Sequence, residues 1–445
     1  LLNDDAAHFF VAQSGLVSNG GAAPDHKTLY AAEKNDYALP DGADTLEVPF
    51  TWQDASGVKV RKVYIFHRAS YVVESKVTID NGSAAPWTGN AYRQLQRTPV
   101  VVSGGSSFGF SNPEKYAFAG AAWYSPQDKF QKLAFDKFAN APLNHDATGG
   151  WVAMLQYYFF AAWIPAAEEA DHFSTAAVAG PEGAHYLIRA VSPAVTVAPN
   201  ESKTLSARLY VGPKLESSLD SVAPGLSLTA DYGMLTVIAE PLHWVLVKLH
   251  SFVGNWGVAI ILLVVLIKLA LFKLSEAQFR SMAKMKKLQP RLEALKERYG
   301  DDKQKLNAAM LELYQKEKIN PVGGCVPLLV QIPVFFALLW VLQGSIELRQ
   351  APFFGWIQNL TAPDPYFILP VLNAIPMILT QWLSPTPAMD PMQAKMMKAM
   401  PFVFSIMLAF APAGLVLYWS VNGWLSLLQQ WVITKRMQVA DAKPR

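Results

Sequence analysis

The sequence predicts two joined parts of different fold class, an all-β domain followed by a polytopic α-helical membrane core. The chain has 445 residues, of which 51% are apolar and only 16% are charged, a composition too apolar for one soluble domain. Up to about residue 225 the apolar residues occur in short runs, whereas beyond Trp256 they form long runs separated by basic segments. We therefore expect a β-sandwich domain over residues 1–228, an amphipathic interfacial helix over 229–253, a five-span core over 254–435 with a cytoplasmic helical hairpin at 275–319, and a cytoplasmic tail over 436–445.

The first domain shows the two-residue period of β-strands. Val58–Phe66 and Tyr71–Ile79 alternate apolar and polar side chains, with Asp54–Gly57 as a turn signal, and similar runs recur at Ala184–Val191 and Thr204–Val211. These runs predict an antiparallel β-sandwich, without specifying the strand order. The histidines of this domain are scattered without the spacing of metal ligands, so we expect no metal site there.

The beginning of the chain carries no signal that would deliver this domain across a membrane. It starts at Leu1, and the first residues lack both the charged region and the apolar region of a targeting segment. We therefore expect that an N-terminal anchor span is missing from this sequence.

Between the two parts, apolar residues recur at helical spacing and form a stripe. Such a stripe suits an amphipathic helix in the membrane interface, and a helix packed on the sandwich explains it nearly as well. Its apolar residues are Leu235, Ile238, Leu242, Leu246 and Leu249, with Trp244 nearby.

The second part contains enough apolar sequence for five membrane spans. A helix needs roughly 20 apolar residues to cross the hydrocarbon core, and Trp256–Leu274, Val322–Ile346 and Tyr366–Leu383 each come close to that length. Pro401–Ile433 is too long for one span and is interrupted at Ala411–Gly414, where proline and glycine favour a reversal. It is therefore interpreted as two short spans joined by a hairpin.

Basic residues predict the orientation of these spans. Lysines and arginines are frequent in residues 275–319, Lys395 and Lys398 precede the fourth span, and Lys435 follows the fifth. In the connection Glu347–Pro365, by contrast, Arg349 is the only basic residue. Because basic residues near span ends stay in the cytoplasm, residues 1–255 should lie outside and the C-terminus inside.

The segment at residues 275–319 should form a helical hairpin. Apolar residues recur there at three- and four-residue intervals from Phe279 to Tyr299 and from Leu306 to Leu313. Gly300 can end the first helix and an aspartate can cap the second, and we expect a kink near Pro290. The charges form a basic face, which is either a binding platform or a solvated surface that only fixes topology.

Several chemistries are disfavoured by what the second part lacks. No histidine follows His250, and Glu347, Asp364 and Asp390 lie at span ends or in loops, which argues against zinc, Ser-His and paired-aspartate proteolysis. The sequence contains no Walker-type glycine loop. We therefore expect no enzyme activity, no catalytic residue, no cofactor and no metal.

The first span contains Lys268, and no acidic residue of that span can pair with it. An ammonium group at this depth must snorkel to the interface or face water inside the bundle. Other spans contribute polar side chains that could line the same wet cavity. These are Gln331, Asn373, Gln381, Ser405, Ser420 and Asn422.

Ordered motifs cover nearly all of residues 230–435, and one more lies in the first domain. They are Asn255–Gly257, Met282–Met285, Leu288–Pro290, Gly300–Gln304, Asn320–Cys325, Glu347–Pro352 and Gly414–Trp419, with Gly149–Gln156 in the first domain. With these motifs the chain resembles the YidC family of membrane protein insertases.

The resemblance implies a periplasmic β-sandwich and a five-helix core whose groove opens to the cytoplasm and to lipid. Lys268 occupies the position where the family usually carries an arginine; lysine keeps the charge but loses the bidentate fork. The expected substrate-binding groove comprises Lys268, Gln331, Gln381, Ser405, Tyr418, Trp419 and Asn422. The expected apolar slide for a departing substrate helix comprises Leu328, Ile332, Phe336, Met400, Phe404 and Met407.

The resemblance also implies partners and a location. The partners are nascent membrane proteins such as the ATP synthase c subunit, the Sec translocon, the ribosome and membrane lipids, without a specific nucleic acid. The location is the bacterial inner membrane. Two other classes stay open from the residues alone: a channel or secondary transporter, which should show paired ion-coupling groups or repeated broken helices, and a membrane-bound hydrolase.

Overall fold

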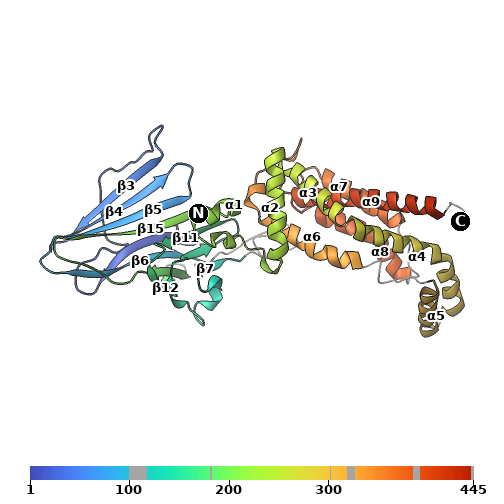
Figure 1. The fold of residues 1–445 in the computed structure, drawn as a ribbon, viewed down its shortest axis with the longest axis horizontal. Helices are drawn as coiled ribbons and strands as arrows, with labels where there is room; N and C mark the ends of the chain where they lie inside the picture. The colour runs from blue at the N-terminus through green and yellow to red at the C-terminus, as the bar shows by residue number, and fades with distance from the viewer. Residues whose placement is uncertain (100–117, 181–182, 301, 318–325, 384–390, 442–445) are drawn as a thin grey trace. The chain divides into compact units, whose positions relative to one another are not determined.

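The computed structural model describes the chain except for residues 100–117, 181–182, 301, 318–325, 384–390 and 442–445 (Figure 1). The chain divides into two compact units, and the boundary lies between Asp231 and Tyr232. Each unit has hydrophobic clusters of its own.

The first unit is built from two antiparallel sheets, as predicted. The nine-stranded sheet has the order β2-β3-β4-β5-β15-β11-β10-β7-β8, and the six-stranded sheet has the order β1-β6-β13-β12-β9 with β14 also pairing with β6. The four predicted strand runs lie in β4, β5, β13 and β15. The strands are β1 (Phe10–Ser18), β2 (Ala31–Ala32), β3 (Thr45–Gln53), β4 (Val58–His67), β5 (Val72–Asn81), β6 (Trp87–Arg97), β7 (Gly120–Ser125), β8 (Lys129–Ala134), β9 (Asn144–Thr148), β10 (Trp151–Leu155), β11 (Phe159–Pro165), β12 (Ala170–Gly180), β13 (Gly183–Val191), β14 (Val195–Val197) and β15 (Ser202–Pro213).

The core of this unit lies between the sheets. Leu95 and Ile188 of the six-stranded sheet belong to the same buried cluster as Met154 and Trp163 of the nine-stranded sheet. The indole Nε1 of Trp163 donates a hydrogen bond to the carbonyl oxygen of Gln94 at 3.1 Å. Because this bond joins β11 to β6, it holds the two layers in one register. A short helix, α1 (Glu216–Val222), follows the last strand.

The second unit is helical. Helix α2 packs against α3 and α6, and the long α9 packs against α3, α4 and α7. Their shared core contains Ile260 and Leu263 of α3, Leu338 and Val341 of α6, and Val416 of α9. The helices are α2 (Thr236–Val253), α3 (Trp256–Ala270), α4 (Phe272–Tyr299), α5 (Lys303–Lys316), α6 (Val326–Gly344), α7 (Ile368–Leu383), α8 (Pro391–Leu408) and α9 (Ala413–Asp441).

Helices α3, α6, α7, α8 and α9 fall in the five apolar stretches. Within the described ranges, no helix by itself combines the length and the hydropathy that a membrane crossing requires, whereas Trp256–Ala270 and Phe272–Met285 do so together, as a pair bent by 67°.

The stripe of α2 packs inside the helical unit. Its residues Ala239, His243 and Leu246 are buried, and Leu235, Ile238, Leu242 and Leu249 lie beside them against the helical core. Val237, Trp244 and Phe252 remain exposed on the other side of the helix. Helix α2 therefore has a buried face and an exposed apolar face.

The boundaries of α8 and α9 differ from the predicted ones, and a bend lies at a position where none was predicted. Helix α4 continues through Pro290, and the bend of 67° lies at Leu271, between α3 and α4. The strong helix formers around Pro290 offset the one hydrogen bond that a proline removes. Helix α8 already begins at Pro391, with Pro401 inside it, and α9 extends into the predicted tail as far as Asp441. The predicted aspartate cap is confirmed, since Asp302 Oδ1 accepts a hydrogen bond from Lys305 N at 3.1 Å.

Candidate functional site

One end of the helical bundle is closed by loops that bond to one another. The backbone N–H of Ala413 donates to the carbonyl of Ala362 at 2.7 Å, and that of Gly414 donates to Leu360 at 2.8 Å. The buried carboxylate of Asp364 accepts three hydrogen bonds, from Trp356 Nε1 and from the backbone N–H groups of Tyr366 and Leu369. These bonds tie the α6–α7 connection to the start of α9.

The start of α3 is fixed at the same end. The side chain of Asn255 accepts from Val258 N at 3.0 Å and donates to the carbonyl of Phe353 at 3.0 Å. A Cβ atom on Gly257 would lie 2.0 Å from the Phe353 ring, so only glycine allows this approach. The Asn255–Gly257 motif therefore holds α3 against the loop that precedes α7.

Lys268 lies in the last turn of α3 and points to α9. Its Nζ donates a hydrogen bond to Ser426 Oγ at 2.7 Å, and Ser426 Oγ in turn donates to the carbonyl oxygen of Asn422 at 2.7 Å. The structure thus joins Lys268 to α9 one turn beyond the predicted groove residue Asn422. Sequence reasoning missed Ser426, although its position four residues after Asn422 places both on one helix face.

The same part of α9 carries further buried polar atoms. The side-chain oxygens of Gln429 and Gln430 are buried and have no hydrogen-bond partner among the described residues, and the same is true of Ser405 Oγ on α8. Neither glutamine was predicted as a site residue. Because an orphaned buried polar atom costs about 1–3 kcal/mol, such atoms are typical of places that water reaches.

Tyr418 and Trp419 belong to an aromatic cluster. The Trp419 ring stacks on Phe335 of α6, with centroids 5.1 Å apart, and lies 4.7 Å from the Phe404 ring of α8. The ring of the buried Tyr418 also stacks with Phe335, with centroids 6.4 Å apart. The predicted groove residue Trp419 thus contacts the predicted slide residue Phe404, so these two sets share a boundary.

The remaining predicted groove residues lie farther along other helices. Gln331 is half-buried on α6, one turn before Phe335, and Gln381 is half-buried near the end of α7. In the described part of the chain no hydrogen bond joins either amide to Lys268. The structure therefore brings Lys268 and Asn422 together through Ser426, and it leaves Gln331 and Gln381 as separate positions.

The predicted slide residues lie on α6 and α8. Ile332, Phe336 and Met400 are exposed, whereas Phe404 and Met407 are half-buried. The side chain of Leu328 lies outside the described residues. Helix α8 also exposes Phe402, Val403 and Ile406, so its apolar surface is wider than the predicted slide.

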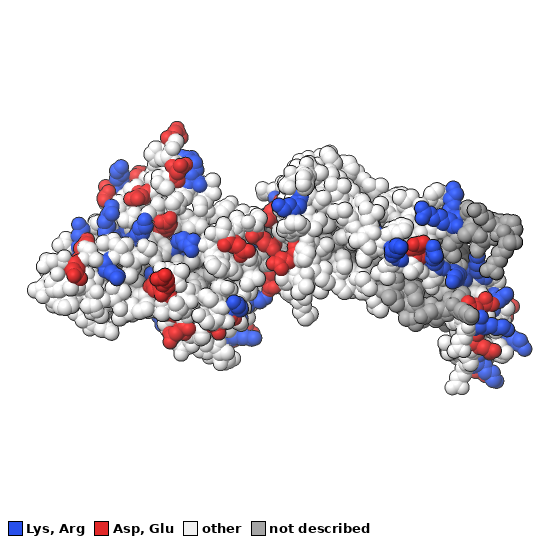
Figure 2. All heavy atoms as spheres, in the orientation of Figure 1, with Lys and Arg blue, Asp and Glu red and all other residues white. Residues whose placement is uncertain are grey.

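The charged residues of the helical unit gather at one end. On the face drawn in Figure 2, blue side chains concentrate over the far parts of α4, α5 and α9, and the surface between them and α2 is almost without charge. Arg291 Nη1 bridges to Glu317 Oε1 at 2.5 Å and joins α4 to the end of α5. Exposed pairs of this kind contribute little to stability.

Comparisons with known proteins agree with this architecture. The model of the 60Kd inner membrane protein family matches residues 248–441, and the model of the YidC periplasmic domain matches residues 1–245. The molecule is therefore of the class of inner membrane proteins that carry a periplasmic domain.

Relatives name the family. The chain is 51% identical to the membrane protein insertase YidC of Stenotrophomonas maltophilia (strain R551-3), covering 98% of this chain and 76% of that protein. It is 48% identical to the insertase of the same name from Methylococcus capsulatus, covering 99% and 79%. A crystal structure of an active YidC insertase aligns over 93% of this chain and 78% of that one, with a TM-score of 0.41 and 18% identity. The chain belongs to the YidC family of membrane protein insertases.

Proposed function

We propose that the helical unit inserts nascent membrane proteins through a hydrated groove beside α3, α8 and α9, in which Lys268 supplies a fixed positive charge. The buried polar oxygens of Ser405, Gln429 and Gln430 carry this proposal, because they have no protein partner among the described residues. Water in the groove would satisfy them, together with the half-buried amide of Asn422.

In this proposal the groove opens to the cytoplasm and is closed towards the periplasm. The loop end of the bundle, with Asp364 and the bonds of Leu360 and Ala362 to the start of α9, forms the closed side. The basic surface of α4, α5 and the end of α9 lies on the cytoplasmic side, in keeping with the rule that basic residues near span ends are retained there. Residues 1–255 are then periplasmic and the C-terminus is cytoplasmic.

The charge of Lys268 acts on the soluble tail of a substrate. Its hydrogen-bond partner, Ser426, is neutral and leaves the positive charge uncompensated. An acidic tail entering the groove would be held by this charge, and the water there would shorten the dry distance that it must cross. A lysine acts here as a point charge, so the attraction does not depend on the bidentate geometry of an arginine.

The apolar part of the substrate leaves along α6 and α8. Ile332, Phe336 and Met400 expose apolar surface, and the contact between Phe404 and Trp419 places this surface next to the groove. A substrate helix could thus pass from water to lipid without an energy source of its own. We include Leu328 and Met407 in this slide, and Gln331, Gln381 and Tyr418 in the groove wall.

The names of the relatives and the basic hairpin indicate the partners. The relatives are named membrane protein insertases, and we propose nascent membrane proteins as the substrates of this chain as well. The basic hairpin of α4 and α5 suits the negatively charged surface of a ribosome. We also propose cooperation with the Sec translocon and with membrane lipids.

Cysteine accessibility tests the groove. In a Cys325→Ser background, single cysteines replace Gln331, Ser405 or Asn422 in inner-membrane vesicles of known orientation, and a membrane-impermeant thiol reagent is added to one side. We expect labelling from the cytoplasmic side only. The matched control is Ile406→Cys, which stands next to Ser405 on α8 but on its exposed apolar surface, and which should stay unlabelled from both sides.

Two results would contradict the proposal. Labelling of the three positions from the periplasmic side would indicate a channel. Labelling at none of them, while a cysteine at the exposed Lys284 reacts normally, would mean that the polar residues make ordinary helix contacts in a dry bundle.

A further inference from the structure

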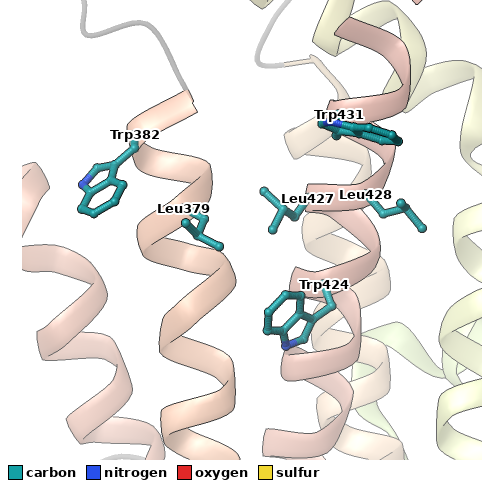
Figure 3. Close-up of a pocket in the computed structure, with 6 residues that line it drawn as sticks. All are labelled: Leu379, Trp382, Trp424, Leu427, Leu428 and Trp431. Atoms are coloured by element: carbon teal, nitrogen blue, oxygen red, sulfur yellow. The ribbon is translucent and has the colours of Figure 1, made fainter. Parts of the chain in front are cut away.

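A second feature of the helical unit lies on α7 and α9, which carry no slide residue. Between α7 and α9 an apolar groove of about 450 Å³ is lined by Leu379, Trp382, Trp424, Leu427, Leu428 and Trp431. In Figure 3, Trp424 and Leu427 point towards α7, and Leu379 points towards α9. The indole Nε1 of Trp424 donates to the carbonyl of Leu372 at 3.1 Å, which fixes this ring across the gap between the helices.

The other end of the groove is marked by positive charge. Trp382 and Trp431 stand at this end (Figure 3), where α7 finishes. Lys435 follows Trp431 by four residues, on the same helix face, and its Nζ lies 5.0 Å from the centre of the Trp431 ring. Both Lys435 and Arg436 are exposed. The groove is thus apolar along its length and cationic at its mouth.

We propose that this groove binds one anionic phospholipid, with an acyl chain along the tryptophan and leucine side chains and the phosphate at Lys435 and Arg436. Tryptophan is enriched at the level of lipid headgroups, and basic residues near the membrane surface attract anionic lipids. The proposal depends on residence in a membrane, which the family shares, and not on the mechanism of insertion.

The size of the groove favours a lipid chain over a protein helix. A helix with its side chains is about 10 Å across and rises 5.4 Å per turn, so the volume corresponds to about one helical turn. A docked transmembrane helix would need a stripe several turns long. A single extended acyl chain fits a narrow space that ends at a charged mouth.

Native mass spectrometry of the full chain in detergent tests the site. The protein is titrated with phosphatidylglycerol and, separately, with phosphatidylcholine of the same acyl chains. We expect the anionic lipid to bind about tenfold more tightly, and the double variant Lys435→Gln/Arg436→Gln to lose this preference. The control Lys284→Gln/Lys287→Gln removes the same charge from α4 and should keep the preference.

A second variant tests the contribution of the groove to lipid binding independently of the charges. Leu379→Trp fills the groove without changing Lys435 or Arg436, and it should remove the one tightly bound anionic lipid. Equal binding of the two lipids to the unmodified chain would overturn the proposal, and so would an equal loss in the α4 control. A dimer mass that Leu379→Trp abolishes would also overturn it, because the groove would then be an interface between two copies of the chain.

Discussion

The two units treat buried positive charge in different ways. In the β-sandwich, the buried Arg93 lies 3.2 Å from Glu169 and 3.6 Å from Asp171. In the helical unit, Lys268 has the neutral hydroxyl of Ser426 as its partner. The buried arginine of the sandwich is thus compensated by carboxylates, whereas no carboxylate among the described residues pairs with Lys268.

The sandwich also contains a buried lysine whose partners are neutral. Lys62 of the sandwich is also buried, and its Nζ donates to the carbonyl of Ser14 at 2.9 Å and lies 4.9 Å from the centre of the Tyr30 ring. Burial lowers the pKa of Lys62 to about 8. Lys62 is thus held by a carbonyl oxygen and an aromatic ring from two other segments of the sandwich, and with a pKa of about 8 it stays mostly protonated at pH 7.

The largest expected effect is the loss of a compensated charge. Arg93→Met should lower the free energy of unfolding of the sandwich by about 3–5 kcal/mol, because the largely buried Glu169 is left without its cation. Pulse proteolysis in urea on the full chain in detergent, with the surviving sandwich fragment quantified, measures the change. Lys268→Met is the matched comparison and should alter the stability of its own unit by less than about 1 kcal/mol. Equal losses in the two units would remove the distinction between them.

Charge reversal at Lys268 comes next and acts on function. Lys268→Glu should reduce insertion of substrates with acidic tails about tenfold, since repulsion replaces attraction, and Lys268→Arg should stay within about twofold of the unmodified chain. Protection of the translocated tail from protease in proteoliposomes measures insertion. Lys273→Glu provides the control, because the same reversal occurs five residues later on an exposed side chain. Unchanged insertion by Lys268→Glu at matched protein levels would rule out the electrostatic role.

The pH dependence of the sandwich should be smaller. Burial, followed by repulsion from Glu169, raises the pKa of Asp171 to about 7 in the folded protein. Because the pKa of Asp171 is higher in the folded than in the unfolded protein, protonation of Asp171 stabilises the folded sandwich. This stabilisation is fully present below about pH 4 and is lost as the pH rises through about 7. Asp171→Asn keeps the site neutral, and the variant should gain about 1–2 kcal/mol relative to the unmodified chain between pH 5 and pH 8. Pulse proteolysis gives the urea midpoint of the unmodified chain and of Asp171→Asn at each pH. Midpoints that change with pH in the same way for both proteins would contradict a raised pKa of Asp171.

The smallest effect should come from the partner of Lys268. Ser426→Ala removes the hydroxyl but leaves the charge, and in a hydrated groove water replaces the lost hydrogen bond, so insertion should change by no more than about twofold. Ser426→Thr, which keeps a hydroxyl at the same position, controls for effects of the substitution on the helix. A loss as large as that of Lys268→Glu would indicate a dry site in which the serine itself is required.

Much of the fold could be predicted from the sequence because it depends on local patterns. The alternation at Val58–Phe66 predicts a strand whatever its neighbours are, and the break at Ala411–Gly414 separates α8 from α9 because proline and glycine interrupt a helix locally. The boundaries were less accurate. The continuation of α4 through Pro290 reflects a balance between one proline and many helix-forming neighbours.

The candidate site was only partly predictable. The sequence by itself determined that Lys268 lacks an acidic partner in its span, since that is a property of one segment. Only the tertiary structure decided that its partner is Ser426, 158 residues away, and that the side-chain oxygens of Gln429 and Gln430 on the same helix are buried. The pairing of Arg93 with Asp171 is of the same kind. Such contacts depend on how helices and strands from distant segments pack, and the composition of each segment is compatible with many packings, so no local pattern specifies them.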